Sequence, residues 1–182
     1  MKDIDINIPK LFRELHGDKA KLSSIIITYS SGIIVSIITI IVTLYLNLPL
    51  WKYILLFILF IDITGGVVAN LSTSTNQYYK DRNTLRVIFL LMHIIQPGLM
   101  LLIFPENYQY LIFIYLFTLG SSLILFKIKS SELQQNIAAL FLVVGITISF
   151  LFKLNILTLY LFGTLYMIKL ILGFSVKRPP FV

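Results

Sequence analysis

The chain has 182 residues, of which 58% are hydrophobic and only 13% are charged, and its mean hydropathy of +0.91 excludes an ordinary soluble domain. It has no cysteine, which excludes disulfides, thiol catalysis and thiolate metal sites. Its net charge of +7 would suit nucleic acid, but most Lys and Arg residues flank apolar runs. There they orient a membrane protein and meet anionic lipid, so we expect no nucleic-acid binding.

Residues 1–24 precede the first long apolar run, and their mixed charge predicts an amphipathic or charged arm in the cytoplasm. Within this arm, Leu11, Phe12 and Leu15 would share one side of a helix, with charged residues on the other. That pattern is typical of a short helix lying along a membrane surface. A partly ordered tail fits the same residues, and both alternatives stay open.

Apolar runs of about 20 residues, the length that crosses a ~30 Å hydrocarbon core, follow one another along the rest of the chain. The connections between most of them are short, which predicts antiparallel neighbours. The predicted fold is therefore all-α, a polytopic integral membrane bundle in which residues 25–175 form the transmembrane domain and 176–182 a short basic cytoplasmic tail. The six expected transmembrane helices are 25–46, 50–70, 84–104, 109–127, 133–152 and 155–175.

The basic residues predict the orientation of this bundle in a cell membrane. With both termini in the cytoplasm, only Lys52 and Lys153 fall on the opposite side, and Lys169 falls within the membrane. Such an asymmetry is the positive-inside pattern of six crossings, and five or seven crossings would disrupt it. The basic residues on the cytoplasmic side are Lys2, Lys10, Arg13, Lys19, Lys21, Lys80, Arg82, Arg86, Lys127, Lys129, Lys177 and Arg178.

Asp62 lies in the middle of the second apolar run. Gly65, Gly66, Ala69 and Asn70 follow at helical spacing, so one helix face carries a carboxylate, three small residues and a carboxamide. An acid at this depth in lipid is costly and by default marks a functional site with a partner. The small residues also have a packing interpretation that needs no ligand, because they let helices approach closely.

His93 lies in the third expected helix, at nearly the same depth as Asp62, since each is roughly 12–13 Å from the cytoplasmic end of its helix. We therefore expect Asp62 and His93 to touch and to serve as a catalytic acid–base pair. Pro97 has no N–H, so the carbonyl of His93 loses its helical partner. This predicts a kink that leaves the oxygen free for a ligand, a water or a side chain. A kink used only for packing is the alternative.

Lys169 lies near the inner end of the sixth expected helix. Its long side chain can reach toward the inner headgroups or pair with Asp62, and the sequence leaves both open. We expect Lys169 and Asn70 to bind the polar head of a substrate.

The connection 71–83 between the second and third expected helices is long and polar. Tyr78, Tyr79 and Arg82 within it are expected to recruit a phosphate or a lipid headgroup. An ordinary interfacial loop carries the same residue types.

The chain has two histidines and no cysteine, which argues against a conventional zinc site, so we expect neither a metal nor another cofactor. An intramembrane aspartyl protease would need a second membrane aspartate, which the apolar runs do not contain. Walker motifs and glycine-rich nucleotide loops are also absent.

Two short stretches carry a resemblance, namely His93-Ile-Ile-Gln-Pro97 and the ending Gly173-Phe-Ser-Val-Lys-Arg-Pro-Pro-Phe181. They resemble segments of a family of uncharacterised small bacterial integral membrane proteins. The likeness covers a small part of the chain and departs in helix number and at several polar positions. That family has no assigned activity, so the resemblance implies only a bacterial membrane protein.

Three functions remain open at this point. The first is an enzyme or binding protein with a cytoplasm-facing intramembrane polar site that binds or modifies a lipid or another amphiphile. The second is a small proton-coupled transporter in which Asp62 titrates and Pro97 forms a gate. The third is a non-catalytic membrane assembly subunit. Membrane lipids are the expected partners, and a homo-oligomer or a partner subunit is left open.

Overall fold

The computed structural model describes residues 3–177 and is almost entirely helical. The predicted all-α bundle is confirmed, and within the described residues six helical spans are long and apolar enough to cross a membrane. Their bounds lie within a few residues of the predicted ones. The six spans are Leu22–Leu46, Leu50–Leu71, Asn83–Ile103, Pro105–Lys127, Ser131–Leu151 and Leu157–Phe174.

Each span contains one or two regular elements, and a small arm precedes the first. The strands are β1 (Asp5–Asn7) and β2 (Lys19–Lys21). The helices are α1 (Arg13–His16), α2 (Leu22–Thr43), α3 (Leu50–Leu71), α4 (Thr73–Tyr78), α5 (Asn83–Met92), α6 (Ile95–Ile103), α7 (Tyr108–Lys127), α8 (Ser131–Leu151) and α9 (Leu157–Met167). Short 3-10 turns cover Lys10–Phe12, Leu44–Leu46 and Pro105–Asn107, and a π-helical segment, Ile168–Phe174, extends α9.

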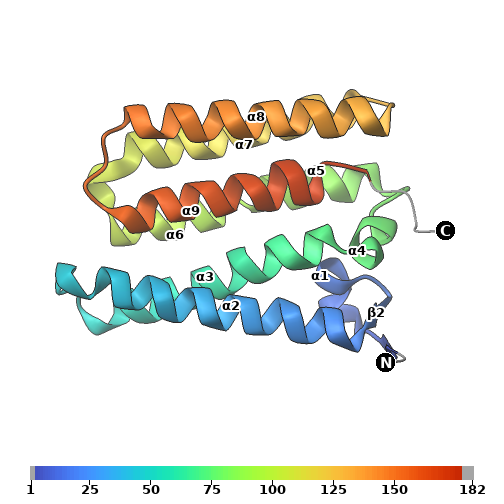
Figure 1. Cartoon of the computed structure of the whole chain (residues 1–182), viewed down its shortest axis with the longest axis horizontal. Coiled ribbons are helices and arrows are strands. Elements are labelled where there is room, and N and C mark those ends of the chain that lie inside the picture. The colour runs from blue at the N-terminus through green and yellow to red at the C-terminus, as the bar shows by residue number, and fades with distance from the viewer. Residues whose placement is uncertain (1–2, 178–182) are drawn as a thin grey trace.

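The spans form hairpins that pack side by side. α2 and α3 lie along one side of the bundle, α7 and α8 along the opposite side, and α5, α6 and α9 lie between them (Figure 1). An even number of spans returns the chain to the end of the bundle where the first span began. The arm, α4 and the end of the π-helical segment therefore lie together at one end (Figure 1). We call this the arm end.

The first helix shows the inside-out pattern of a membrane span. The residues that α2 buries are all small or polar, whereas isoleucines such as Ile34 and Ile41 are exposed. Ser36 donates to the carbonyl oxygens of Gly32 at 2.7 Å and of Phe57 on α3 at 3.1 Å. A hydroxyl bonded to a backbone carbonyl is satisfied without water, so α2 and α3 can pack closely inside a membrane.

The predicted break beside Pro97 is confirmed. α5 ends at Met92 and α6 begins at Ile95, so the third span is two helices joined at His93. The Tyr166 hydroxyl donates to the His93 carbonyl oxygen at 3.0 Å. The Gln96 backbone N–H donates to the same oxygen at 3.3 Å. The oxygen is therefore bonded within the span, and the Tyr166 side chain ties the break to α9.

The arm is ordered and has a short helical stretch where the sequence suggested one. Its placement on a membrane surface stays a prediction. β1 and β2 pair antiparallel, with Ile6 opposite Ala20, and enclose the short helical stretch 10–16. The arm packs on α4, where Thr75 Oγ1 donates to the Leu15 carbonyl oxygen at 2.6 Å. Gly17 has a φ of +77°, and a Cβ there would lie 2.5 Å from the Ser74 carbonyl oxygen, so only glycine fits this approach. The arm is a folded unit because strand pairing and this contact hold it.

The arm also reaches α2 through a buried histidine. His16 Nε2 lies 3.2 Å from the Tyr29 hydroxyl, and burial lowers the pKa of His16 below its ordinary value. The docked arm therefore prefers the neutral ring. Protons bind the undocked ring more readily, so docking is favoured above the ordinary imidazole pKa of about 6.5 and weakens as the pH falls below it.

This dependence is measurable by hydrogen exchange. We expect the amides of β2 to lose protection between pH 7.5 and pH 5.5, after correction for intrinsic exchange, while the amides of α7 keep theirs. His16→Phe should remove the difference. Equal loss in the wild type and in His16→Phe would contradict the assignment to His16.

Candidate functional site

Asp62 and Lys169 form an ion pair inside the bundle. Lys169 Nζ lies 3.2 Å from Asp62 Oδ2 and 3.3 Å from the Asp62 carbonyl oxygen. The pair is asymmetric, because the Lys169 side chain is 3% exposed and the Asp62 side chain 52% exposed. Of the two fates left open for Lys169, the structure shows pairing. The cation is enclosed, and its carboxylate partner is open on one side.

Gly66 makes room for the lysine. A Cβ at Gly66 would lie 2.3 Å from Lys169 Cε and 2.8 Å from Nζ. Gly65 instead faces α2, where its Cβ would lie 3.3 Å from the Thr28 carbonyl oxygen. The packing interpretation therefore fits Gly65, whereas Gly66 is required where the lysine stem crosses α3.

Asn70 supports the segment that carries the lysine. Its side-chain amide donates to the Lys169 carbonyl oxygen at 3.2 Å, within the π-helical segment. π-Helical turns are rare and often mark functional sites. Both Asn70 and Lys169 are buried. Lys169 contacts Asp62, and Asn70 holds the backbone of Lys169, whereas the expected binding of a substrate head stays a prediction.

His93 reaches the same site but not the expected partner. Its Nδ1 lies 2.6 Å from the Phe89 carbonyl oxygen, and since a carbonyl only accepts, Nδ1 carries the proton. In the neutral ring, Nε2 is then an acceptor. Asp62 Oδ2 instead accepts a hydrogen bond from Gln96 Nε2, one turn beyond His93. The predicted Asp62–His93 pair is thus corrected to Asp62 with Lys169 and Gln96.

Asp62 and His93 nevertheless line one groove of about 530 Å³ between α3 and the α5–α6 span. The groove has a polar floor and an apolar wall, and the wall residues Ile88, Met92 and Ile95 are exposed on the outer surface of the bundle. The groove therefore opens on the lateral surface of the bundle, the surface that would face a membrane. The lining residues are Glu14, Asp62, Tyr79, Leu85, Ile88, Phe89, Met92, His93, Ile95 and Gln96.

Two lining residues carry buried polar atoms without a hydrogen-bond partner, Gln96 Oε1 and the Tyr79 hydroxyl. Gln96 is 7% exposed and Tyr79 3% exposed. Burial raises the pKa of the Tyr79 phenol above its ordinary value, so the hydroxyl stays protonated. An unpaired buried polar atom is costly, so each of these two is a position at which a bound group could complete a hydrogen bond.

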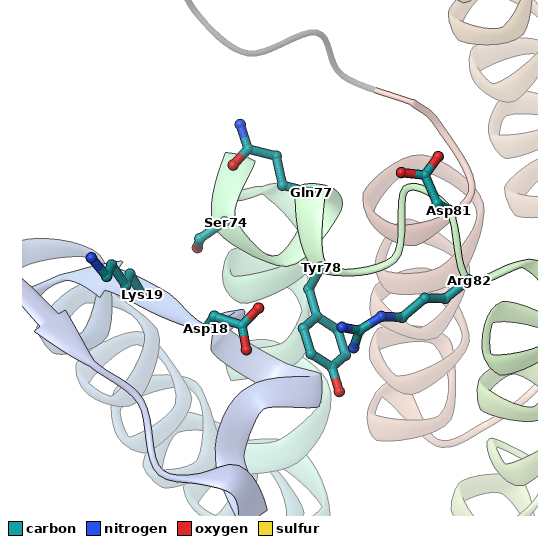
Figure 2. Close-up of a pocket in the computed structure, with 7 residues that line it drawn as sticks. All are labelled: Asp18, Lys19, Ser74, Gln77, Tyr78, Asp81 and Arg82. Carbon is teal, nitrogen blue, oxygen red and sulfur yellow. The ribbon is translucent and has the colours of Figure 1, made fainter.

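The residues predicted to recruit a headgroup divide between two pockets. Tyr79 lines the groove, whereas Tyr78 and Arg82 line a separate polar pocket of about 420 Å³ between α4 and the arm (Figure 2). There the Arg82 guanidinium lies 4.1 Å from the centre of the Tyr78 ring. Asp18, Lys19 and Asp81 also line this pocket, so it contains both acidic and basic side chains.

The connection 71–83, which the sequence suggested as a loop, contains the helix α4. Ser72 caps the N-terminus of this helix, because its side chain accepts a hydrogen bond from the Thr75 amide at 3.3 Å.

Sequence reasoning missed Glu14, Arg86 and Gln96. Arg86, expected to flank the membrane, is buried and donates to the Phe174 carbonyl oxygen at 3.1 Å, at the end of the π-helical segment. Its position one turn inside α5 was an available signal. Gln96, a polar residue next to Pro97, was another. Glu14 gave no signal, because its place depends on how the arm folds.

The six long apolar helices among the described residues support a multi-pass membrane protein. Comparisons with protein-family models, curated proteins and solved structures find no match. The resemblance to small bacterial membrane proteins stays a prediction.

The asymmetry of the ion pair predicts unequal effects of its two halves on stability. Asp62→Asn leaves the enclosed ammonium without its counter-charge, and we expect a loss of about 3–5 kcal/mol in the free energy of unfolding. Lys169→Met should cost less, because the half-open carboxylate keeps Gln96 and access to its surroundings. The double variant Asp62→Asn/Lys169→Met should recover most of the loss.

Unfolding in mixed micelles by titration with dodecyl sulfate measures these values. Asp81→Asn, an acid outside the pair, is the matched control. Additive effects in the double variant, or a smaller loss for Asp62→Asn than for Lys169→Met, would contradict the pairing.

Proposed function

We propose that this protein binds the polar end of a lipid or another amphiphile in the groove beside Asp62. The single observation that carries the proposal is the combination, in one sideways-opening groove, of a half-open carboxylate, two unpaired buried polar atoms and an apolar wall. A ligand with a polar head and an apolar chain satisfies both parts. A volume of about 530 Å³ lies in the range of ligand pockets.

The proposed setting is a cell membrane with both termini in the cytoplasm. The basic residues support this orientation, because the arm end carries almost all of those that flank the spans. Glu14 belongs to the arm and Tyr79 directly follows α4, so the groove begins at this end and extends inward to Asp62. In this orientation the amphiphile enters from the cytoplasmic leaflet.

The packing beyond Asp62 favours a one-sided groove over a transport path. Leu56 and Phe60 on α3, together with Ile114 and Phe162 from neighbouring spans, are fully buried and apolar. They close the interior on the side away from the arm end. The buried hydroxyls of Thr43 and Thr158 on that side bond to each other at 2.7 Å, whereas a proton-coupled transporter would need an acid or a base there.

Binding needs only the groove, whereas modification of the ligand would also use His93. With Nδ1 bonded to Phe89, Nε2 of a neutral His93 is the ring atom that can take a proton from a bound head. This observation favours acid–base chemistry as the second candidate function, with His93 as the base and Asp62 orienting the head.

Blocking the groove tests the binding proposal. Ile88→Trp fills the apolar wall, and Ile34→Trp is the control at an exposed position of α2 outside the groove. We expect native mass spectrometry of protein exposed to a total lipid extract to show one retained amphiphile per chain in the wild type and in Ile34→Trp. Ile88→Trp should retain roughly tenfold less. Equal retention by all three proteins, or retention by none, would contradict the proposal.

A further inference from the structure

We infer that the groove selects an amphiphile whose polar end is a protonated amine. The inference rests on the proposed function and names the ligand class of the same site. The reason is that the polar atoms of the residues lining the groove are nearly all hydrogen-bond acceptors.

Two carboxylates line the groove at different depths. Glu14 on α1 is exposed at the arm end, and Asp62 lies near the middle of α3 with its side chain half exposed. Lys169 balances the charge of Asp62 from behind. Glu14 therefore leaves the groove with an excess of negative charge, which favours a cation and disfavours a phosphate or carboxylate head.

The neutral polar groups add further acceptors. Gln96 donates to Asp62 through its side-chain N–H₂, and its buried carbonyl oxygen, Oε1, has no hydrogen-bond donor. Nε2 of a neutral His93 accepts, because Nδ1 carries the proton that bonds to the Phe89 carbonyl oxygen. The Tyr79 hydroxyl can accept as well as donate. A primary ammonium group carries three donors and no acceptor, so it complements this set, whereas a quaternary ammonium offers charge alone.

The cations of the region are not available to an anionic head. Among the described residues that line the groove, none is Lys or Arg. Lys169 is enclosed beneath Asp62, and the Arg82 guanidinium lies on the Tyr78 ring in the other pocket. The apolar wall at Ile88, Met92 and Ile95 then requires a chain on the amine rather than a small soluble cation.

Matched amphiphiles test this selectivity in the purified full-length protein in a neutral maltoside detergent. One series compares phosphatidylethanolamine, phosphatidylcholine and phosphatidylglycerol with identical acyl chains, and the other compares dodecylamine with dodecyltrimethylammonium. We expect the primary amine in each series to bind roughly ten- to hundredfold more tightly, as read by native mass spectrometry. A preference for dodecylamine alone would support the ammonium class and assign the natural ligand to single-chain amines rather than aminophospholipids.

Three variants locate the effect. Glu14→Gln removes the exposed acid, and Asp62→Asn/Lys169→Met removes the inner acid together with its counter-charge, so the interior keeps no unpaired ammonium. Each should reduce the amine preference at least severalfold, whereas Asp81→Asn, an acid at the same end of the bundle but outside the groove, should keep it.

The outcomes separate this inference from the proposed function. If all amphiphiles bind equally and Ile88→Trp still reduces binding, the amine selectivity is overturned and the groove remains a binding site. A preference for phosphatidylglycerol, or a preference that survives both acid variants, would overturn the selectivity in the same way. If no amphiphile binds, both proposals are overturned.

Discussion

The contact between Lys169 and Asp62 is the constraint on which the rest of the site depends. An ammonium enclosed among apolar helices is unfavourable unless a carboxylate and further acceptors surround it. Here, Asp62 provides a carboxylate oxygen and a backbone carbonyl at 3.2 and 3.3 Å. Gly66 leaves the space that the stem requires, and Asn70 holds the lysine backbone. Three small or polar positions on one face of α3 thus serve a single cation.

The same contact explains why the groove has a polar floor. Once Lys169 fixes Asp62 from the interior, the other side of the carboxylate faces the α5–α6 span, where Gln96 reaches it. The break at Pro97 allows this approach, because the third span is divided and Tyr166 anchors the His93 carbonyl. The helix break and the ion pair therefore act together to place His93, Gln96 and Asp62 in one groove.

The sequence predicts correctly those features that depend only on neighbouring residues or on position along the chain. Span length and hydropathy predicted six membrane helices, Pro97 predicted the break, and the isolated Asp62 marked the site. Sequence reasoning failed where the answer depends on helix rotation. Matching depth suggested His93 as the partner of Asp62, yet depth says nothing about which face of α5 or α6 meets α3, and Gln96 makes the contact. Arg86 was placed at the surface for the same reason. The fold of the arm, and with it the position of Glu14, depends on long-range strand pairing and on the contact at Gly17.

The nitrogen resonance of the Lys169 side chain reports directly on whether Asp62 encloses a charged ammonium. In lysine-labelled protein in lipid nanodiscs, assigned with Lys169→Met, a cation enclosed by Asp62 should give a charged ammonium signal whose hydrogens exchange slowly with water. Lysines of the arm end, such as Lys19, should exchange too fast to observe under the same conditions. A Lys169 signal that exchanges as fast as those of the arm would contradict the enclosed ion pair and, with it, the groove built on Asp62.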